Sequence, residues 1–182
     1  LLEKPMGRDS KECERMIKEA KKYGIKLCVC HNQLFYPHVK RLKSIADSED
    51  FKMISFRTFH RENFEWLKVH GLAQPWNIRP EHGGILWEVG THLAYLQLHF
   101  LNDINEVYAL GTKAKYPVWD DFTVLLRTSS GRWGVMEISW VAKESEIVYE
   151  IISSKGDRVQ TFLPHGYIFE RTQYPPADFK GV

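Results

Sequence analysis

Apolar residues recur every three or four positions after Asp9, and this period predicts an amphipathic helix near the start of the chain. Asp9 and Glu12 have the spacing of an N-terminal capping box, and Gly24 is placed to end the helix. Residues 1–4 and 25–30, on either side, are short apolar runs typical of strands buried on both faces. Strand, helix and strand within thirty residues predict a βαβ unit of a doubly wound parallel sheet.

The chain beyond residue 33 has a different pattern, and it predicts an α+β fold. Helices are expected over residues 37–47 and 85–101, and residues 61–84 and the tail 174–182 are expected to be loops. The runs that look like strands are residues 51–60, 106–113, 121–128, 132–142, 146–154 and 158–163. Because the last five are joined by short turns, we expect a mixed, largely antiparallel sheet with the helices on one face.

Composition excludes several classes of partner. The net charge is only +2 and no basic stripe stands out, so nothing favours nucleic acid. The longest apolar run is too short to cross a bilayer, so no membrane is expected. Three cysteines and no signal peptide favour a reducing, cytoplasmic location. Cys28 and Cys30 alternate across a predicted strand, so they cannot face one metal ion, and we expect no metal site.

Two places in the sequence have the properties of a reactive site. Lys4 precedes Pro5, which favours extended backbone, and ligands of open α/β sheets bind at the carboxyl ends of such strands. Glu88 and His92 share one face of an apolar helix, where ionisable groups need partners. The helix also contains Gly90, which suggests that another group approaches closely. The alternatives are an ordinary surface lysine and a satisfied core histidine.

The ordered motifs Glu3-Lys4-Pro5, the capped helix, HNQLFYP and GGILWEVGTH resemble those of the Gfo/Idh/MocA oxidoreductases, which include glucose–fructose oxidoreductase and inositol dehydrogenase. The resemblance implies an N-terminal Rossmann domain that binds NAD or NADP. It also implies a C-terminal domain with substrate contacts and an oligomerising sheet. Residues 1–33 would then be the end of the Rossmann domain, and residues 34–182 an incomplete C-terminal domain.

The resemblance also implies roles for single residues. Lys4 would lie near the nicotinamide and the reacting hydroxyl, His92 would transfer the proton, and Glu88 stands where the family usually has aspartate. A histidine suits proton transfer near neutrality, and a nearby ammonium stabilises negative charge that develops on oxygen. The expected cofactor contacts are Glu3, Lys4, Pro5 and Asn32. The expected substrate contacts, chosen as side chains that bind hydroxyls or a carboxylate, are Asn63, Trp66, Trp76 and Arg79.

No Gly-x-Gly occurs in the sequence, and the family places that phosphate-binding turn before the lysine motif. We therefore expect a fragment of an NAD(P)-dependent oxidoreductase of sugars, polyols or related compounds. Alone it should bind no cofactor tightly, have negligible activity and form homo-oligomers through its sheet. One alternative is a truncated, non-enzymatic interaction module or one chain of a split dehydrogenase. Another is a metal-dependent lyase or hydrolase that uses Glu88, His92 and loop histidines.

Overall fold

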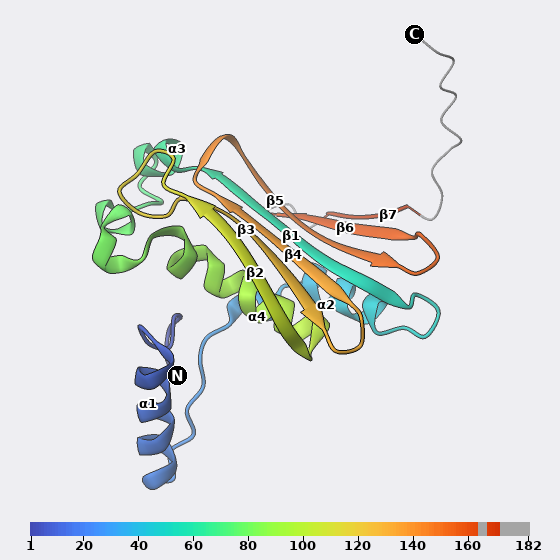
Figure 1. The fold of residues 1–182 in the computed structure, drawn as a ribbon, viewed down its shortest axis with the longest axis horizontal. Coiled ribbons are helices and arrows are strands. Elements are labelled where there is room, and N and C mark those ends of the chain that lie inside the picture. The colour runs from blue at the N-terminus through green and yellow to red at the C-terminus, as the bar shows by residue number, and fades with distance from the viewer. Residues whose placement is uncertain (164–166, 172–182) are drawn as a thin grey trace.

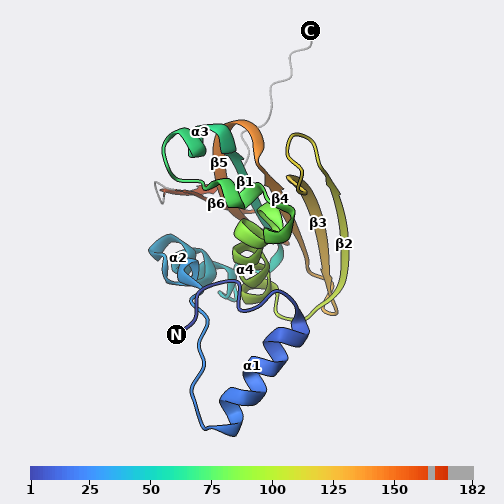
Figure 2. The ribbon, with the colours of Figure 1, turned by 90° about the vertical axis from the view of Figure 1, so that its left-hand side faces the viewer.

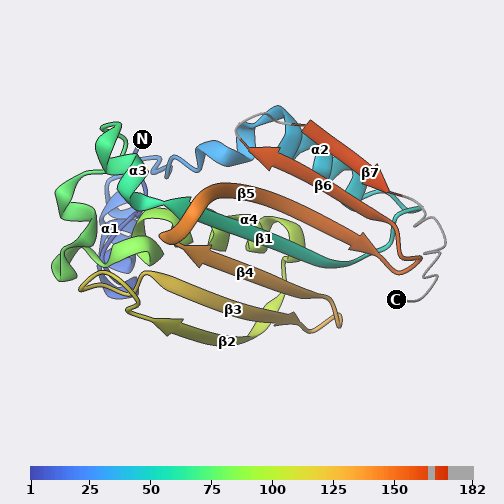
Figure 3. The same cartoon turned by 90° about the horizontal axis from the view of Figure 1, so that it is seen from above.

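The computed structural model describes residues 1–163 and 167–171, so the expected loop over residues 174–182 lies outside the described residues. A seven-stranded sheet with the order β2-β3-β4-β1-β5-β6-β7 dominates the fold (Figure 3). Its strands are β1 (Met53–Asn63), β2 (Ile104–Thr112), β3 (Asp121–Thr128), β4 (Trp133–Ser139), β5 (Val141–Ser153), β6 (Arg158–Leu163) and β7 (Tyr167–Arg171). Only β1 and β4 pair in parallel, which confirms a mixed, largely antiparallel sheet.

Helices α2 (Pro37–Ala46) and α4 (Thr91–Leu101) cover one face of this sheet (Figures 1 and 2). The core lies between them and the sheet. Phe56 of β1 stacks on Phe100 of α4 with ring centroids 4.0 Å apart, and both side chains are buried. Burying a phenylalanine contributes about 1.5–3 kcal/mol, so contacts of this kind fix α4 against the centre of the sheet. The expected α+β class is confirmed.

The N-terminal helix α1 (Ser10–Lys22) forms as predicted. Asp9 caps it by accepting a hydrogen bond of 2.7 Å from the Glu12 amide, and Gly24 follows its end with a left-handed φ of +65°. The two strands expected beside it shrink to one parallel bridge between Leu2 and Val29. Helix α1 buries no residue and stands away from the large sheet (Figure 1). Among the described residues no further strand pairs with this bridge, so the backbone there does not form longer strands.

Two other predicted boundaries are wrong. The expected loop over residues 61–84 begins inside β1, and α3 (Phe64–Val69) and two short 3₁₀ helices (Pro75–Ile78 and Pro80–His82) follow. The expected strand over residues 132–142 ends at Ser139, because the chain bends at Trp140 and enters β5 directly. Strands β4 and β5 then flank β1 on opposite sides. This rearrangement brings Trp140 to the end of β1 where the candidate site lies.

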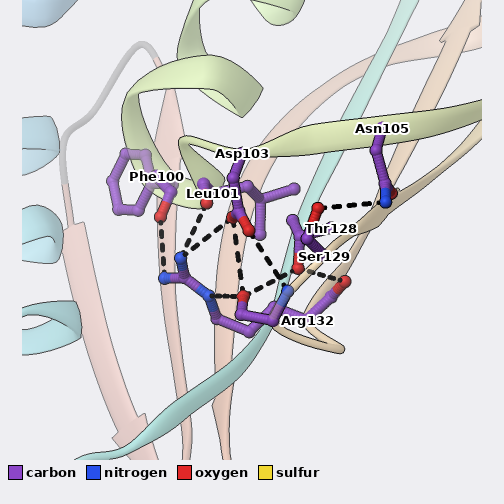
Figure 4. A network of polar contacts seen from close by, with 8 residues as sticks. Phe100, Leu101, Asp103, Asn105, Thr128, Ser129 and Arg132 are labelled. Atoms are coloured by element: carbon purple, nitrogen blue, oxygen red, sulfur yellow. Dashed lines mark hydrogen bonds and ion pairs between the residues drawn. The ribbon is translucent and has the colours of Figure 1, made fainter.

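Arg132 ties the end of α4 to the turn between β3 and β4 (Figure 4). Its guanidinium donates to the carbonyl oxygens of Leu101 at 2.7 Å and Phe100 at 3.5 Å. It also lies 3.6 Å from Asp103, which accepts a hydrogen bond from the Ser130 amide. The last carbonyls of a helix have no partner within the helix, so this arginine satisfies two of them.

We expect Arg132→Met to lower the free energy of unfolding by about 1–2 kcal/mol, because the helix-end carbonyls and Asp103 lose a charged donor. Urea denaturation measures the change. The matched control is Arg127→Met, whose guanidinium is exposed and lies 3.9 Å from Glu106; it should cost less than about 0.5 kcal/mol. Equal losses in both variants would contradict the role given to Arg132.

Candidate active site

The N-terminal segment meets the helical part of the larger domain through one lysine. Lys4 Nζ donates to the Glu88 carboxylate at 2.8 Å and to the Glu88 backbone carbonyl at 2.7 Å. The Lys4 side chain is only 14% exposed, and that of Glu88 is half-exposed. A partly buried ammonium needs a charged partner, and Glu88 supplies two oxygen acceptors from a single residue. Glu88 thus orients Lys4.

Glu88 lies in a π-helical turn, Leu86–Gly90, that leads directly into α4. The predicted helix over residues 85–101 is therefore a π turn followed by an α-helix. Such turns are frequent at functional sites. A Cβ on Gly90 would lie 2.9 Å from the end of the Leu86 side chain in the same turn and 3.5 Å from Ile138 of β4, so the nearest group from another element is at ordinary contact distance. Gly84 has a φ of +66° and packs against Val118, which fixes the chain just before the turn.

His92, on the first turn of α4, is held by a chain of hydrogen bonds. Its Nδ1 lies 3.1 Å from the Tyr95 hydroxyl oxygen, which accepts a 3.2 Å hydrogen bond from the Gln33 amide. The Tyr149 hydroxyl in turn donates to the Gln33 side chain at 2.9 Å. Tyr95 and Tyr149 are buried, so the chain reaches from the centre of the sheet to the imidazole. Because Tyr95 holds Nδ1, Nε2 is the ring nitrogen that can serve a ligand.

The pKa of His92 is lowered to about 4. Burial is the largest cause, the positive charge of Lys4 lowers the pKa further, and the negative charge of Glu88 opposes both. The imidazole is therefore neutral at pH 7, and its lone pair is on Nε2 when Nδ1–H donates to the Tyr95 hydroxyl. The structure thus places a cation, a carboxylate and a neutral base close enough to influence one another.

Glu88 and His92 line a cavity of about 490 Å³. The other residues around it are Gln33, His60, Glu62, Phe64, Leu67, Leu72, Ala73, Gln74, Trp76, Asn77, Val89 and Trp140. A second cavity of about 690 Å³ shares Trp76, Asn77 and Glu88 with the first and extends to Pro5. The two cavities therefore adjoin at Glu88, the residue that binds Lys4.

The structure brings only part of the expected site together. Trp76 lines both cavities and Pro5 lines the second, whereas the remaining expected contacts line neither: Glu3, Lys4, Asn32, Asn63, Trp66 and Arg79. Asn63 caps α3, because its side chain accepts from the Trp66 amide and donates to the Lys143 carbonyl. Trp66 stacks on His70 instead, with ring centroids 3.9 Å apart. Both ends of the Asn63 amide are therefore occupied by the protein itself.

Three residues that line the first cavity were not expected from the sequence. They are His60 and Glu62, at the end of β1, and Trp140, which lies beside them. Glu62 accepts a 3.2 Å hydrogen bond from the Trp140 indole N–H and lies 3.1 Å from the His60 ring. Burial raises the pKa of Glu62, but the contacts with His60 and Trp140 outweigh it and hold that pKa below its usual range. The sequence signal that could have identified His60 and Glu62 was the alternation of side chains along a strand. Thr58, His60 and Glu62 all lie on the helix-facing side of β1.

Within the described part of the chain, no three His, Cys, Asp or Glu side chains gather in a way that could hold a metal ion. The same residues contain no helix with the length and apolar character needed to span a membrane.

Replacing Lys4 should raise the pKa of His92, because the lysine charge is one of the causes that lower it. We expect an NMR titration of the His92 ring to have a midpoint at about pH 4 in the wild type and at a higher pH in Lys4→Met. Lys26→Met, on an exposed segment, serves as the matched control and should leave the midpoint unchanged. An unchanged midpoint in Lys4→Met would show that the two groups do not interact.

The fold is an α+β domain in which Glu88 and His92 line one cavity beside the sheet. Residues 42–158, well over half of the chain, match the family model of the GFO/IDH/MocA C-terminal domain. The chain therefore belongs to the Gfo/Idh/MocA family of oxidoreductases, as the motifs of its sequence suggested. No curated protein sequence matches it significantly.

Several solved structures share the fold. GenD2 from gentamicin A biosynthesis, in complex with NAD, has a TM-score of 0.76 and 23% identity over 88% of this chain and 46% of its own. UDP-N-acetylglucosamine 3-dehydrogenase GnnA from Acidithiobacillus ferrooxidans has a TM-score of 0.76 and 16% identity over 96% and 52%. An inositol dehydrogenase homolog from Azotobacter vinelandii, in complex with NADH and myo-inositol, has a TM-score of 0.75. Its sequence identity is 19%, over 94% of this chain and 49% of its own. The chain spans about half the length of these proteins.

Proposed function

We propose that this chain is the substrate-binding part of an NAD(P)-dependent oxidoreductase. The reaction transfers hydride between the nicotinamide and a hydroxyl-bearing carbon of a sugar, polyol or related compound. Residues 1–33 form the end of the nucleotide-binding domain, and the larger domain begins at residue 34. The contact of Lys4 with Glu88, at the edge of the cavity that holds His92, is the observation that carries the proposal.

The residues present fit one end of the cofactor. The second cavity lies against Pro5, Gly7 and the residue that binds Lys4, which suits the nicotinamide ring. The sequence contains no Gly-x-Gly turn, so the residues that would hold the phosphates are not part of this chain. When bound, the nicotinamide accepts or delivers the hydride.

The side chains of this chain handle the proton and the charge. In the oxidation direction, neutral His92 accepts the hydroxyl proton of the substrate at Nε2, and Tyr95 keeps its ring in place. The Lys4 ammonium stabilises negative charge on the substrate oxygen, and Glu88 holds that ammonium at the cavity. Trp76 and Asn77, on the rim shared by the two cavities, offer a flat apolar face and a polar amide to the sugar ring.

The relatives support this class of reaction. GenD2 is described in complex with NAD, and the Azotobacter vinelandii protein with NADH and myo-inositol. A WlbA dehydrogenase from Bordetella pertussis is described with NADH and UDP-GlcNAcA. Each of these proteins combines a nicotinamide cofactor with the fold of this chain, and two of them hold a sugar or cyclitol compound.

Hydride transfer in the full-length protein that contains this chain tests the proposal. We expect reduction of NAD or NADP with a sugar or polyol, followed at the absorbance of the reduced nicotinamide. In His92→Asn, kcat should fall by about 10²–10⁴-fold, the usual contribution of a general base. His70→Asn, whose ring stacks on Trp66 outside both cavities, is the control and should keep its kcat. A His92→Asn variant as fast as the wild type would refute the proposed role.

We further propose a homo-oligomer formed through the face of the sheet that the helices leave uncovered. Tyr108 and Leu125 are cross-strand partners on that face, 62% and 47% exposed, and Trp133 on β4 is 36% exposed. An apolar strip of this kind is typical of a protein interface.

The three cysteines are unpaired, which fits the cytoplasmic location expected from the sequence.

We expect Leu125→Glu to shift the chain toward the monomer in analytical ultracentrifugation, because a carboxylate in the apolar strip would be buried without a partner. Leu125→Met is the matched control, because it changes the same side chain and keeps it apolar, and it should leave the association unchanged. A wild-type chain that sediments as a monomer at high concentration would contradict the interface.

A further inference from the structure

The charged groups around the 490 Å³ cavity are unevenly distributed. Its described lining residues include two carboxylates, Glu62 and Glu88, and neither a lysine nor an arginine. Lys4 neutralises Glu88 through the 2.8 Å contact. Among the lining residues no lysine or arginine faces Glu62, whose contacts are the Trp140 indole and the His60 ring. The wall formed by the end of β1 therefore carries a carboxylate that the mechanism proposed above does not use.

This wall is also built to stay in place. Trp140 is 2% exposed, and its indole N–H fixes one oxygen of Glu62. His60 is 5% exposed and lines the same cavity, and its Nε2 lies 3.1 Å from the other oxygen of Glu62. The carboxylate is therefore held between two buried rings at the cavity wall. His92, on the opposite element α4, is neutral at pH 7 and does not balance the carboxylate.

We propose that Glu62 and His60 select a substrate that carries a free amino group, and that the enzyme acts on an amino sugar or an aminocyclitol. The inference rests on the proposed function and names its substrate class. An ammonium group bound by a carboxylate forms a charge-assisted hydrogen bond, which is about twice as strong as a neutral one. The amine lies at the β1 wall while the reacting hydroxyl lies at His92. A substrate carboxylate at the β1 wall meets a like charge and is rejected.

Sugar binding to the chain itself tests this inference without any cofactor. The probes are glucosamine, N-acetylglucosamine and glucuronate, which share a six-membered ring and differ in charge. The signal is the NMR resonance of the Trp140 indole N–H, because that group is bonded to Glu62. We expect glucosamine to shift it with a Kd about ten-fold lower than that of N-acetylglucosamine, and glucuronate to leave it unchanged.

The variant Glu62→Gln keeps a carbonyl oxygen for the indole and removes the charge. We expect it to bind glucosamine and N-acetylglucosamine with equal affinity. Glu65→Gln is the matched control. Glu65 lies on α3, accepts a hydrogen bond from the Tyr116 hydroxyl and is outside the cavity, so the ten-fold preference for glucosamine should persist. If Glu62→Gln does not fold, the wild-type comparison of glucosamine with N-acetylglucosamine decides alone, since acetylation converts the charged amine to a neutral amide.

Two results would overturn the inference. Equal affinity of the wild type for all neutral and aminated sugars would remove the amine preference and leave the proposed hydride transfer intact. A cavity that responds to no sugar would also refute the inference, and the kinetic comparison of His92→Asn with the wild type would then decide the proposed function independently.

Discussion

The contact between the Lys4 ammonium and the Glu88 carboxylate is the constraint on which the candidate site depends. It joins residues 84 positions apart in the sequence. A lysine with a mostly buried side chain loses hydration, and the loss is offset only if a charged partner stands at hydrogen-bond distance. The π-helical turn supplies that partner with both its carboxylate and its carbonyl oxygen. The segment that carries Lys4 is thereby held beside the cavity lined by His92.

The sheet supplies the rigid side of the same site. Strand β5 carries Tyr149, whose hydrogen bond to Gln33 begins the chain that ends at the His92 imidazole. Strand β1 carries His60 and Glu62 on its helix-facing side. Residues placed on strands are positioned more accurately than residues on loops. The chemistry of the site is thus divided between a fixed wall on the sheet and a docked N-terminal segment.

Much of the fold could be predicted from the sequence because local signals and the final packing agree. The strands over residues 121–128 and 158–163 and the cap at Asp9 follow directly from alternation and capping chemistry. The bend at Trp140 could not be predicted, because a strand-like pattern without glycine or proline continues through it and only the placement of β4 and β5 on either side of β1 makes the chain turn there.

The site was predicted less completely, for a physical reason. Glu88 and His92 line one cavity because both lie on the helix that the sequence predicted over residues 85–101, whereas the contact of Lys4 with Glu88 depends on the tertiary fold. The capping role of Asn63 was not foreseen, because a side-chain amide suits a helix cap as well as a ligand. Glu62 was missed because a glutamate at the end of a strand looks like a surface residue until Trp140 covers it.

The central claim, that the N-terminal lysine docks onto the π-helical turn, can be measured directly by nuclear Overhauser spectroscopy of the isotopically labelled chain. The account predicts cross-peaks between the ε-methylene protons of Lys4 and the γ-methylene protons of Glu88. Their absence, in a sample whose cross-peaks between Phe56 and Phe100 show that the core is folded, would contradict it.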